Sequence, residues 1–235
     1  MIPATTARKA VILAAGKGTR MRELTTDLPK PMIPVRGRPI LEHIVSGLQL
    51  AGISHILIIV GYRAEVVQNH FGNGSAFNVS IEYLTQSVQD GTGRVVDLAK
   101  NFAAQDPFIL SYGDILIDPA NYPKLAHLGT AEALVSVKYN PEEVSKGGAV
   151  FVNDRFEVTD LREKPQPGEP TSPWYNAGVY TFRHSIFTHT ALLQPSPRGE
   201  YELTDAVRSL AQSGATVQAL ELSGDWADVR DPEIL

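Results

Sequence analysis

The segment 10–20, AVILAAGKGTR, restricts the possible folds more than any other part of the sequence. It begins with an apolar run at residues 10–13, which predicts a buried β-strand. A loop of small and basic residues follows directly, at 14–20. Glycines allow backbone N–H groups to converge on an anion, and basic side chains add positive charge at the same place. The segment therefore predicts a phosphate-binding loop at the end of the first strand of a sheet.

Lys30 extends this basic region. It lies between Pro29 and Pro31, two residues that disfavour a helix, so we predict an extended segment here. An extended backbone would let the Lys30 side chain reach back over the glycine loop.

The spacing of the glycines excludes two common nucleotide motifs. Gly16 and Gly18 are followed by Met21, where the dinucleotide-binding fingerprint has its third glycine. A P-loop needs a glycine five positions before its lysine, and the GKGT sequence lacks it. If only the Gly-x-Gly pattern is considered, the alternative to a phosphate-binding loop is an ordinary strand-to-helix turn that binds no ligand.

After Pro39 the chain alternates between helical and strand-like hydrophobic patterns. Helices and strands follow one another in the first half, which predicts a parallel, doubly wound sheet with its ligand site at the carboxyl ends of the strands. Between 138 and 182, turns replace helices as connections, including a hairpin of 147–151 with 157–162 turned at Asn153 and Asp154, which predicts an antiparallel substrate lobe. The predicted helices are 40–50, 64–71, 94–104, 119–128 and 203–212, and the predicted strands are 55–60, 79–84, 108–110, 132–138, 147–151, 157–162 and 217–220.

These patterns predict one α/β domain over residues 1–235, with a Rossmann-like, mixed, mostly parallel sheet flanked by helices and a small antiparallel lobe. A length of 235 residues with 43% hydrophobic content is enough to bury such a core. We expect a nucleotide-binding half at about 1–137, the lobe at about 138–222, and a C-terminal loop at 223–235.

Charge and composition exclude several classes of function. The formal net charge is −5, which disfavours a nucleic-acid surface. The absence of cysteine excludes disulfides, thiol nucleophiles and cysteine-bound metals. The apolar stretch at 56–60 is too short to span a bilayer, and residues 1–9 have no signal-peptide core. We therefore expect a soluble cytoplasmic protein whose partners are small molecules rather than a membrane or a nucleic acid.

The string LAAGKGTRM, followed by LPKPM, is far more specific than its glycines alone. It resembles the signature of the sugar-1-phosphate nucleotidylyltransferases, the pyrophosphorylases that make nucleotide sugars. The resemblance covers nearly the whole chain and is closest to the uridylyl- and thymidylyltransferases. It implies the nucleotide-diphospho-sugar transferase fold and a Mg²⁺-dependent, direct in-line transfer of UMP or dTMP to a sugar 1-phosphate, with release of pyrophosphate.

The resemblance also implies roles for individual residues. For the nucleoside triphosphate, it implies binding by Ala14, Ala15, Gly16, Gly18, Thr19, Gln86, Gly91 and Thr92, with Arg20 and Lys30 acting on the α- and departing phosphates. Gln86 would read a pyrimidine, because an amide can pair with both a donor and an acceptor on the uracil edge. For the sugar phosphate, it implies Lys164 at the phosphate and Gly148, Glu163, Asn176 and Glu200 in the sugar pocket.

Asp114 and Asp228 match the two metal-binding acids of the family, in Gly-Asp at mid-chain and in Trp-x-Asp near the end. Mg²⁺ takes one or two carboxylates and fills its other positions with substrate oxygens and water. If either aspartate is considered alone, the ordinary interpretation is that it is a solvent-exposed loop residue with no ligand. Arg230 and Asp231 replace the usual Gly-Thr after this motif, so we expect altered metal affinity. The chain also stops soon afterwards, as either a minimal enzyme or a shortened form of a longer protein would.

Other functions remain open at this point. Guanylyl transfer to a mannose- or heptose-type phosphate, or cytidylyl transfer to phosphocholine, would keep the fold and change the substrates. A glycosyltransferase usually has Asp-x-Asp at its metal, whereas Asp114 is followed by Ile115 and Leu116. A regulatory subunit that binds a nucleotide sugar without turnover would be expected to lose Arg20, Lys30, Asp114 or Asp228, and all four are present. Neither the sugar nor the oligomeric state, monomer or homo-oligomer, follows from the sequence.

Overall fold

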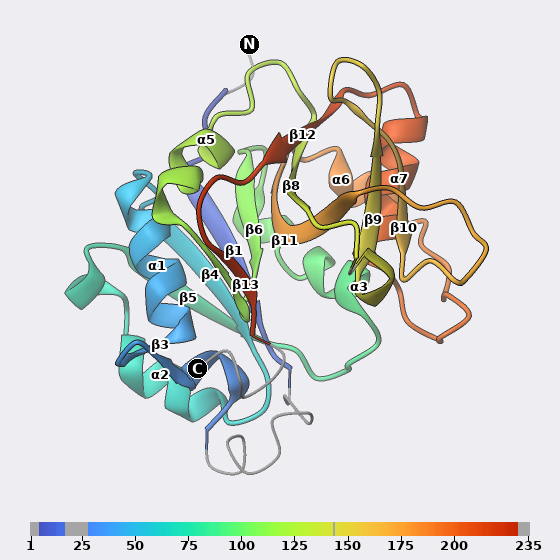
Figure 1. The fold of residues 1–235 in the computed structure, drawn as a ribbon. Helices are drawn as coiled ribbons and strands as arrows, with labels where there is room; N and C mark the ends of the chain where they lie inside the picture. Colours follow the sequence, from blue (N-terminus) through green and yellow to red (C-terminus); the bar gives the residue numbers. More distant parts are fainter. Residues whose placement is uncertain (1–4, 17–27, 143, 230–235) are drawn as a thin grey trace.

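The computed structural model describes residues 5–16, 28–142 and 144–229 (Figure 1). The described residues form a central mixed sheet of nine strands. Its parallel strands are β1 (Lys9–Ala14), β4 (His55–Val60), β5 (Ser80–Thr85) and β6 (Phe108–Tyr112), in the order β6-β1-β4-β5. Leu13 lies in register with Ile59 on one side and Tyr112 on the other, so the carboxyl ends of these strands are level. The predicted doubly wound, largely parallel sheet is confirmed.

The antiparallel strands continue the same sheet. β11 (Trp174–Phe182) pairs with β6 along its second half and with β9 (Gly148–Val152) at its start, and β8 (Ala133–Tyr139) pairs along its other edge. β9 forms the predicted hairpin with β10 (Val158–Glu163), turned where the Asn153 N–H donates to the Glu157 carbonyl at 2.9 Å. β12 (Val217–Glu221) pairs parallel to β8. The predicted antiparallel part is therefore present, joined to the parallel strands through β11.

Helices cover both faces of the sheet (Figure 1). On one face, α1 (Ile40–Leu50), α2 (Ala64–Phe71) and α5 (Tyr122–Ala126) bury apolar side chains against a cluster that includes Ile12 of β1. On the other face, α3 (Thr92–Asp97), α4 (Lys100–Ala103), α6 (Ile186–Thr190) and α7 (Leu203–Gln212) pack in a cluster that includes Val11. Successive strand residues point to opposite faces, which is why Val11 and Ile12 belong to different clusters.

The predicted helices 40–50, 64–71 and 203–212 are confirmed, whereas two others are shorter than predicted. Residues 94–104 do not form one helix, because tighter i→i−3 bonds from the N–H groups of Leu98 and Ala99 separate α3 from α4. Residues 119–128 form a 3-10 turn at Pro119–Asn121, capped by the Asp118 side chain, and then the short α5. The structure also has α6, which the hydrophobic pattern did not predict.

The prediction of an extended backbone at Lys30 was wrong. Lys30–Met32 is a single 3-10 turn, in which the Met32 N–H donates to the Pro29 carbonyl at 2.8 Å. Proline tolerates the first positions of a helical turn because its missing N–H would have no partner there. A short hairpin of β2 (Pro34–Val35) and β3 (Arg38–Pro39) follows.

The C-terminal segment predicted as a loop at 223–235 contains a strand. β13 (Trp226–Asp228) pairs antiparallel with β7 (Ile115–Ile117), so Asp228 lies opposite Ile115. Three-residue strands are too short for a hydrophobic period to reveal them. The remaining elements are the 3-10 turns Ser75–Phe77 and Val144–Lys146. Across the described ranges, no helix combines the length and apolar character needed to cross a membrane.

Candidate active site

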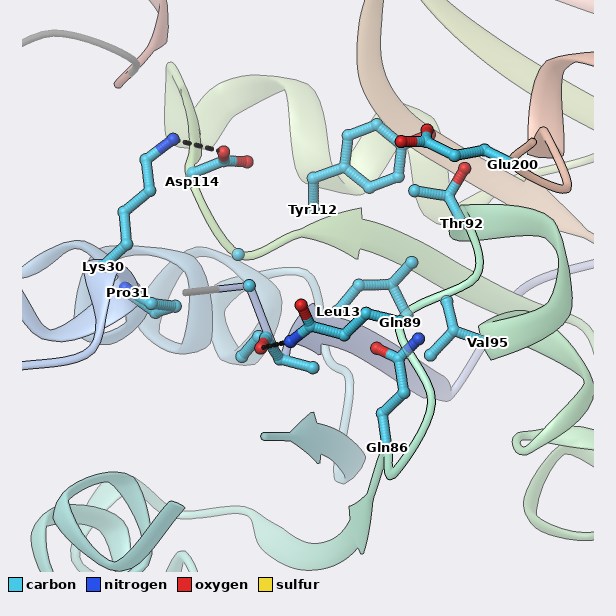
Figure 2. Close-up of a pocket in the computed structure, with 15 residues that line it drawn as sticks. Leu13, Lys30, Pro31, Gln86, Gln89, Thr92, Val95, Tyr112, Asp114 and Glu200 are labelled. Atoms are coloured by element: carbon cyan, nitrogen blue, oxygen red, sulfur yellow. Dashed lines mark hydrogen bonds and ion pairs between the residues drawn. The ribbon is translucent and has the colours of Figure 1, made fainter. Parts of the chain in front are cut away.

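Two adjoining cavities lie at the carboxyl ends of the parallel strands. The first, of about 420 Å³, lies beside the ends of β1, β5 and β6 (Figure 2). The second, of about 250 Å³, extends from the end of β6 to the antiparallel strands. Five residues line both cavities: Lys30, Thr92, Tyr112, Asp114 and Glu200. Ligands bound in the two cavities would therefore meet at these side chains.

The first cavity is lined by the described residues that were predicted to bind the nucleotide. These are Ala14, Ala15 and Gly16 at the end of β1, and Gln86, Gly91 and Thr92 after β5. No described atom lies within 4 Å of the position that a Cβ on Gly16 would take, so its backbone is open to a ligand. The predicted residues Gly18, Thr19 and Arg20 lie outside the described ranges.

Two glutamine amides in the loop after β5 bond to backbone carbonyls. The Gln86 Nε2 donates to the carbonyl of Val88 at 2.8 Å. The Gln89 Nε2 donates to the carbonyl of Ala15 at 3.0 Å (Figure 2). Each amide therefore uses one N–H of its Nε2 within the protein and has a second N–H and its Oε1 for other partners. The sequence analysis did not single out Gln89, although a second amide three residues after Gln86 was a visible signal.

The second cavity is lined by every residue predicted for the sugar phosphate: Gly148, Glu163, Lys164, Asn176 and Glu200. Lys164 has a φ of 44°, and its N–H donates to the Gly147 carbonyl at 2.7 Å. This tight turn directly after β10 fixes where the lysine side chain begins. The structure brings these five residues to one cavity, and their individual roles stay predictions.

Lys30 and Asp114 form an ion pair at the boundary between the cavities. The Lys30 Nζ lies 2.6 Å from the Asp114 Oδ2, and the two side chains are 13% and 33% exposed. Asp114 is held in place by Gly113, whose N–H donates to the Leu13 carbonyl at 2.9 Å. A Cβ on Gly113 would lie 2.8 Å from that carbonyl oxygen, so glycine permits this close approach to β1.

Asp114 and Asp228 fit the donor set that Mg²⁺ prefers. Both line the second cavity, and their backbones are neighbours because the Val229 N–H donates to the Asp114 carbonyl at 2.9 Å. The Trp226 indole anchors β13, the strand that carries Asp228, by donating to the Ala177 carbonyl at 3.0 Å. The described residues hold no group of three or more histidines or acids that could bind a metal. Two carboxylates suit a cation that takes its other ligands from substrate and water.

Backbone hydrogen bonds connect the loop after β5 to the segment before α7. The Gly93 N–H donates to the Tyr201 carbonyl at 2.7 Å, and the Tyr201 N–H donates to the Asp90 carbonyl at 2.8 Å. A Cβ on Gly91 would lie 2.4 Å from the Tyr201 carbonyl oxygen. The Arg94 guanidinium covers the Tyr201 ring at 3.8 Å. The walls of the two cavities therefore form one hydrogen-bonded unit.

Arg198 balances three acids of the second cavity. Its Nη2 lies 2.7 Å from Glu202, 3.5 Å from Glu200 and 3.9 Å from Glu163. The sequence did not predict Arg198 as a site residue, although it lies two residues before the predicted Glu200. The ion pairs keep the acidic side chains close together without leaving their charges unopposed.

Two tyrosines that the sequence did not predict as site residues lie at the site: Tyr112 lines both cavities, and Tyr180 lies behind it. Tyr112 and Tyr180 have hydroxyl oxygens 3.4 Å apart, and the Asn176 Nδ2 donates to the Tyr180 hydroxyl at 2.6 Å. Burial raises the pKa of both phenols well above its usual range, so both hydroxyls stay neutral. Tyr112 directly precedes the Gly-Asp motif, and Tyr180 lies two residues after the Asn-Ala-Gly motif. These positions next to two predicted motifs were the available signal.

Comparison with known proteins agrees with this geometry. Residues 9–233 match the family described as nucleotidyl transferase. The UTP–glucose-1-phosphate uridylyltransferase AglF of Haloferax volcanii is 36% identical over 228 residues, which cover 96% of this chain and 92% of AglF. The bifunctional protein GlmU of Methanococcus aeolicus is 38% identical over 224 residues, covering 95% of this chain and 51% of GlmU. This chain thus spans about half the length of several curated relatives that it matches.

A solved structure shares the architecture. It is that of a Bacillus anthracis protein assigned as a glucose-1-phosphate thymidylyltransferase, in complex with sucrose. The two chains superpose with a TM-score of 0.86 and 28% identity, covering 96% of this chain and 91% of the other. The fold and the family match agree with the class of protein that the sequence predicted. The chain belongs to the nucleotidyl transferase family.

Proposed function

We propose that this protein transfers a uridylyl or thymidylyl group from a nucleoside triphosphate to a sugar 1-phosphate, with release of pyrophosphate. The observation that carries the proposal is the pair of cavities that meet at Lys30 and Asp114. Two substrates seated there would have their reacting phosphates side by side, and positioning of this kind supplies much of the catalysis in such a transfer. The names of AglF and of the Bacillus anthracis protein support the same substrates.

In this proposal the first cavity holds the nucleotide. Backbone groups of Ala14, Ala15 and Gly16, continued by Gly18 and Thr19, bind the triphosphate, and Gln86, Gly91 and Thr92 bind the base. Arg20 and Lys30 offset the negative charge on the α- and departing phosphates. The Lys30 side chain extends from the 3-10 turn Lys30–Met32 to the boundary between the cavities. Its ammonium can therefore contact both Asp114 and an α-phosphate.

The second cavity holds the sugar phosphate. Lys164 pairs with the phosphate and keeps its attacking oxygen directed at the α-phosphorus, while Glu163 and Asn176 bind hydroxyls. Gly148 leaves room for the sugar beside Asn176, and Glu200 faces both substrates. The proposed division is therefore a nucleotide-binding half at about 1–137, a sugar-binding lobe at about 138–222 and a metal-binding loop at 223–235.

Asp114 and Asp228 would hold Mg²⁺. When bound, the cation supplies positive charge that polarises the α-phosphate and offsets repulsion between the two anionic substrates. The Lys30 ammonium contacts Oδ2 of Asp114, and Asp228 lines the same second cavity, so both carboxylates would be within the site that holds the cation. The substrates also support a cytoplasmic location, where nucleoside triphosphates are available.

A second candidate, guanylyl transfer, is favoured by one observation. The Nε2 groups of Gln86 and Gln89 are both engaged by backbone carbonyls, so these amides offer acceptors to the base. The guanine edge has two adjacent donors, at N1 and N2, whereas the uracil edge has one donor between two acceptors. Two Oε1 acceptors could pair with both guanine donors, whereas uracil would use one of them at N3–H and would take a donor from the second N–H of an amide.

A screen of pyrophosphate release tests the proposal. UTP, dTTP, GTP, CTP and ATP are each combined with a panel of sugar 1-phosphates and with phosphocholine, at saturating Mg²⁺. We expect turnover with UTP or dTTP and one or more sugar 1-phosphates, and none in the Asp114→Asn, Asp228→Asn double variant. Turnover with GTP alone would select the second candidate. Release with phosphocholine alone, or with none of these acceptors, would contradict both.

A further inference from the structure

We propose that Lys30 weakens the binding of a divalent cation until a triphosphate is bound. The inference rests on the proposed function, because it concerns the Asp114 and Asp228 site and the nucleoside triphosphate in the first cavity. In the proposed function, Lys30 offsets charge on the phosphates. Its ion pair with Asp114 would have a second effect, which is to make the binding of the cation depend on the binding of the triphosphate.

The Lys30 ammonium already contacts one of the two carboxylates (Figure 2). Its Nζ lies 2.6 Å from the Asp114 Oδ2, and the Lys30 side chain is only 13% exposed. A charge that is shielded from water in this way acts more strongly on its neighbours. Both oxygens of a carboxylate belong to one small group, so a cation at either oxygen of Asp114 would lie close to the ammonium. The two positive charges would repel each other there.

The backbone holds both members of this pair in place. Lys30 begins a 3-10 turn whose next two residues are buried, and the Ile33 N–H donates to the Lys30 carbonyl at 3.1 Å. The Asp114 carbonyl accepts from the Val229 N–H at 2.9 Å. These bonds fix where the two side chains begin. The flexible lysine side chain still allows the ammonium to reach from the carboxylate to a nearby phosphate.

Among the described residues, Lys30 is the one basic side chain that lines both cavities. Lys164 and Arg198 line the second cavity only. Arg198 also has an acid of its own, since its Nη2 lies 2.7 Å from Glu202. Lys30 is therefore the positive group that contacts Asp114 and that a triphosphate in the first cavity can also reach.

A triphosphate would offset the repulsion. The residues that the structure describes offer a cation the carboxylates of Asp114 and Asp228, and they include no cluster of three acids or histidines. Phosphate oxygens supply the cation with further ligands, and they supply the Lys30 ammonium with negative charge. The cation and the triphosphate should therefore strengthen each other's binding, and Lys30 should account for part of that coupling.

Lys30→Met tests this effect, because methionine keeps an unbranched side chain and carries no charge. Binding of Mn²⁺ alone, without nucleotide, is measured by electron paramagnetic resonance. We expect Lys30→Met to bind Mn²⁺ about tenfold more tightly than the wild type, since the ion pair and the repulsion are both removed. Lys30→Arg keeps the positive charge and should bind Mn²⁺ as weakly as the wild type. Lys100→Met, at an exposed position of α4, is the matched control and should also leave the affinity unchanged.

Two further measurements connect the gain to Asp114 and to the triphosphate. Asp114→Asn added to Lys30→Met should remove the gain, because no carboxylate is then released. Calorimetry gives the affinity for UTP with and without saturating Mn²⁺. The factor by which Mn²⁺ tightens UTP binding should be about tenfold smaller in Lys30→Met than in the wild type, because the coupling between two ligands is reciprocal.

Several results would each overturn the inference: equal Mn²⁺ affinity in Lys30→Met and the wild type, the same gain in Lys30→Arg or Lys100→Met, a gain that survives Asp114→Asn, or an unchanged coupling factor. These results leave the proposed function intact, because pyrophosphate release by the wild type decides it. No turnover of any sugar phosphate by the wild type would instead overturn the proposed function. Absence of Mn²⁺ binding by every variant, with and without UTP, would overturn the metal site and this inference with it.

Discussion

The Lys30 ammonium lies 2.6 Å from a carboxylate oxygen of Asp114, at the point where the two cavities meet. The pair joins the turn after the glycine loop to the end of β6, two segments 84 residues apart. An ion pair with both side chains partly shielded from water is stronger than one on the surface. The two residues thus place a positive and a negative group where reacting phosphates and a cation would lie.

Asp114→Asn should keep the fold and lower kcat about a hundredfold at saturating Mg²⁺, because in the proposed site the charge of the carboxylate would hold the cation. Asp228→Asn should behave alike. Steady-state kinetics over a magnesium titration measures both effects, and Asp154→Asn in the exposed hairpin turn is the matched control. Near-normal turnover in Asp114→Asn would refute the metal assignment. If only Asp228→Asn leaves turnover unchanged, the second metal ligand must be a residue other than Asp228.

Lys164→Ala and Lys30→Ala should affect different substrates. Loss of Lys164 should raise the KM for the sugar phosphate about tenfold or more and lower kcat, while calorimetric affinity for the nucleoside triphosphate stays nearly unchanged. Loss of Lys30 should weaken the triphosphate more. Lys100→Ala on the exposed face of α4 controls for loss of a positive charge. The division into nucleotide and sugar cavities is wrong if Lys164→Ala weakens the triphosphate and spares the sugar phosphate.

Gln86→Ala should reduce discrimination between nucleobases more than it slows the preferred reaction, because a site built for hydrogen bonds rejects a wrong base by leaving polar groups unpaired. Competition between labelled triphosphates measures the ratio of kcat/KM values. Gln89→Ala provides the comparison, since it releases the Ala15 carbonyl and should weaken all bases together. An unchanged base preference in Gln86→Ala would show that this side chain does not read the base.

Gly91→Ala should destabilise the protein by about 3 kcal/mol, combining backbone strain at a φ of 119° with overlap of the new Cβ and the Tyr201 backbone. The control is Gly129→Ala, where φ is 57° and no described atom lies within 4 Å, so strain alone should cost about 1 kcal/mol. Urea unfolding of both variants measures the difference. Equal midpoints would contradict the close packing of the two cavity walls.

The sequence predicted the parts of this protein that depend on local pattern. The strand at 55–60, the helix at 64–71 and the hairpin turn at Asn153 each have a hydrophobic period or turn residues that act over short range. The predicted site residues that the structure describes line the two cavities. They could be predicted from the sequence because each lies in a short, recognisable motif.

Features that arise from tertiary contact were not predictable in this way. β7 and β13 are three residues long and exist because they pair with each other, far apart in the chain. The turn at Lys30 was misjudged because proline excludes helix interiors but not the start of a helical turn. The hydrogen bond from Asn176 to Tyr180 was not predictable, because a strand irregularity brings these two side chains together.

The most direct test of the central claim follows the bond that forms. The wild-type protein is incubated with a nucleoside triphosphate and a sugar 1-phosphate whose terminal phosphate oxygens carry ¹⁸O, and the products are examined by ³¹P NMR. If a sugar-phosphate oxygen attacks the α-phosphorus, the nucleotide sugar will carry ¹⁸O in its diphosphate bridge, and the released pyrophosphate will be unlabelled. An unlabelled bridge, labelled pyrophosphate, or no nucleotide sugar with any base and sugar of the panel would contradict nucleotidyl transfer to a sugar 1-phosphate.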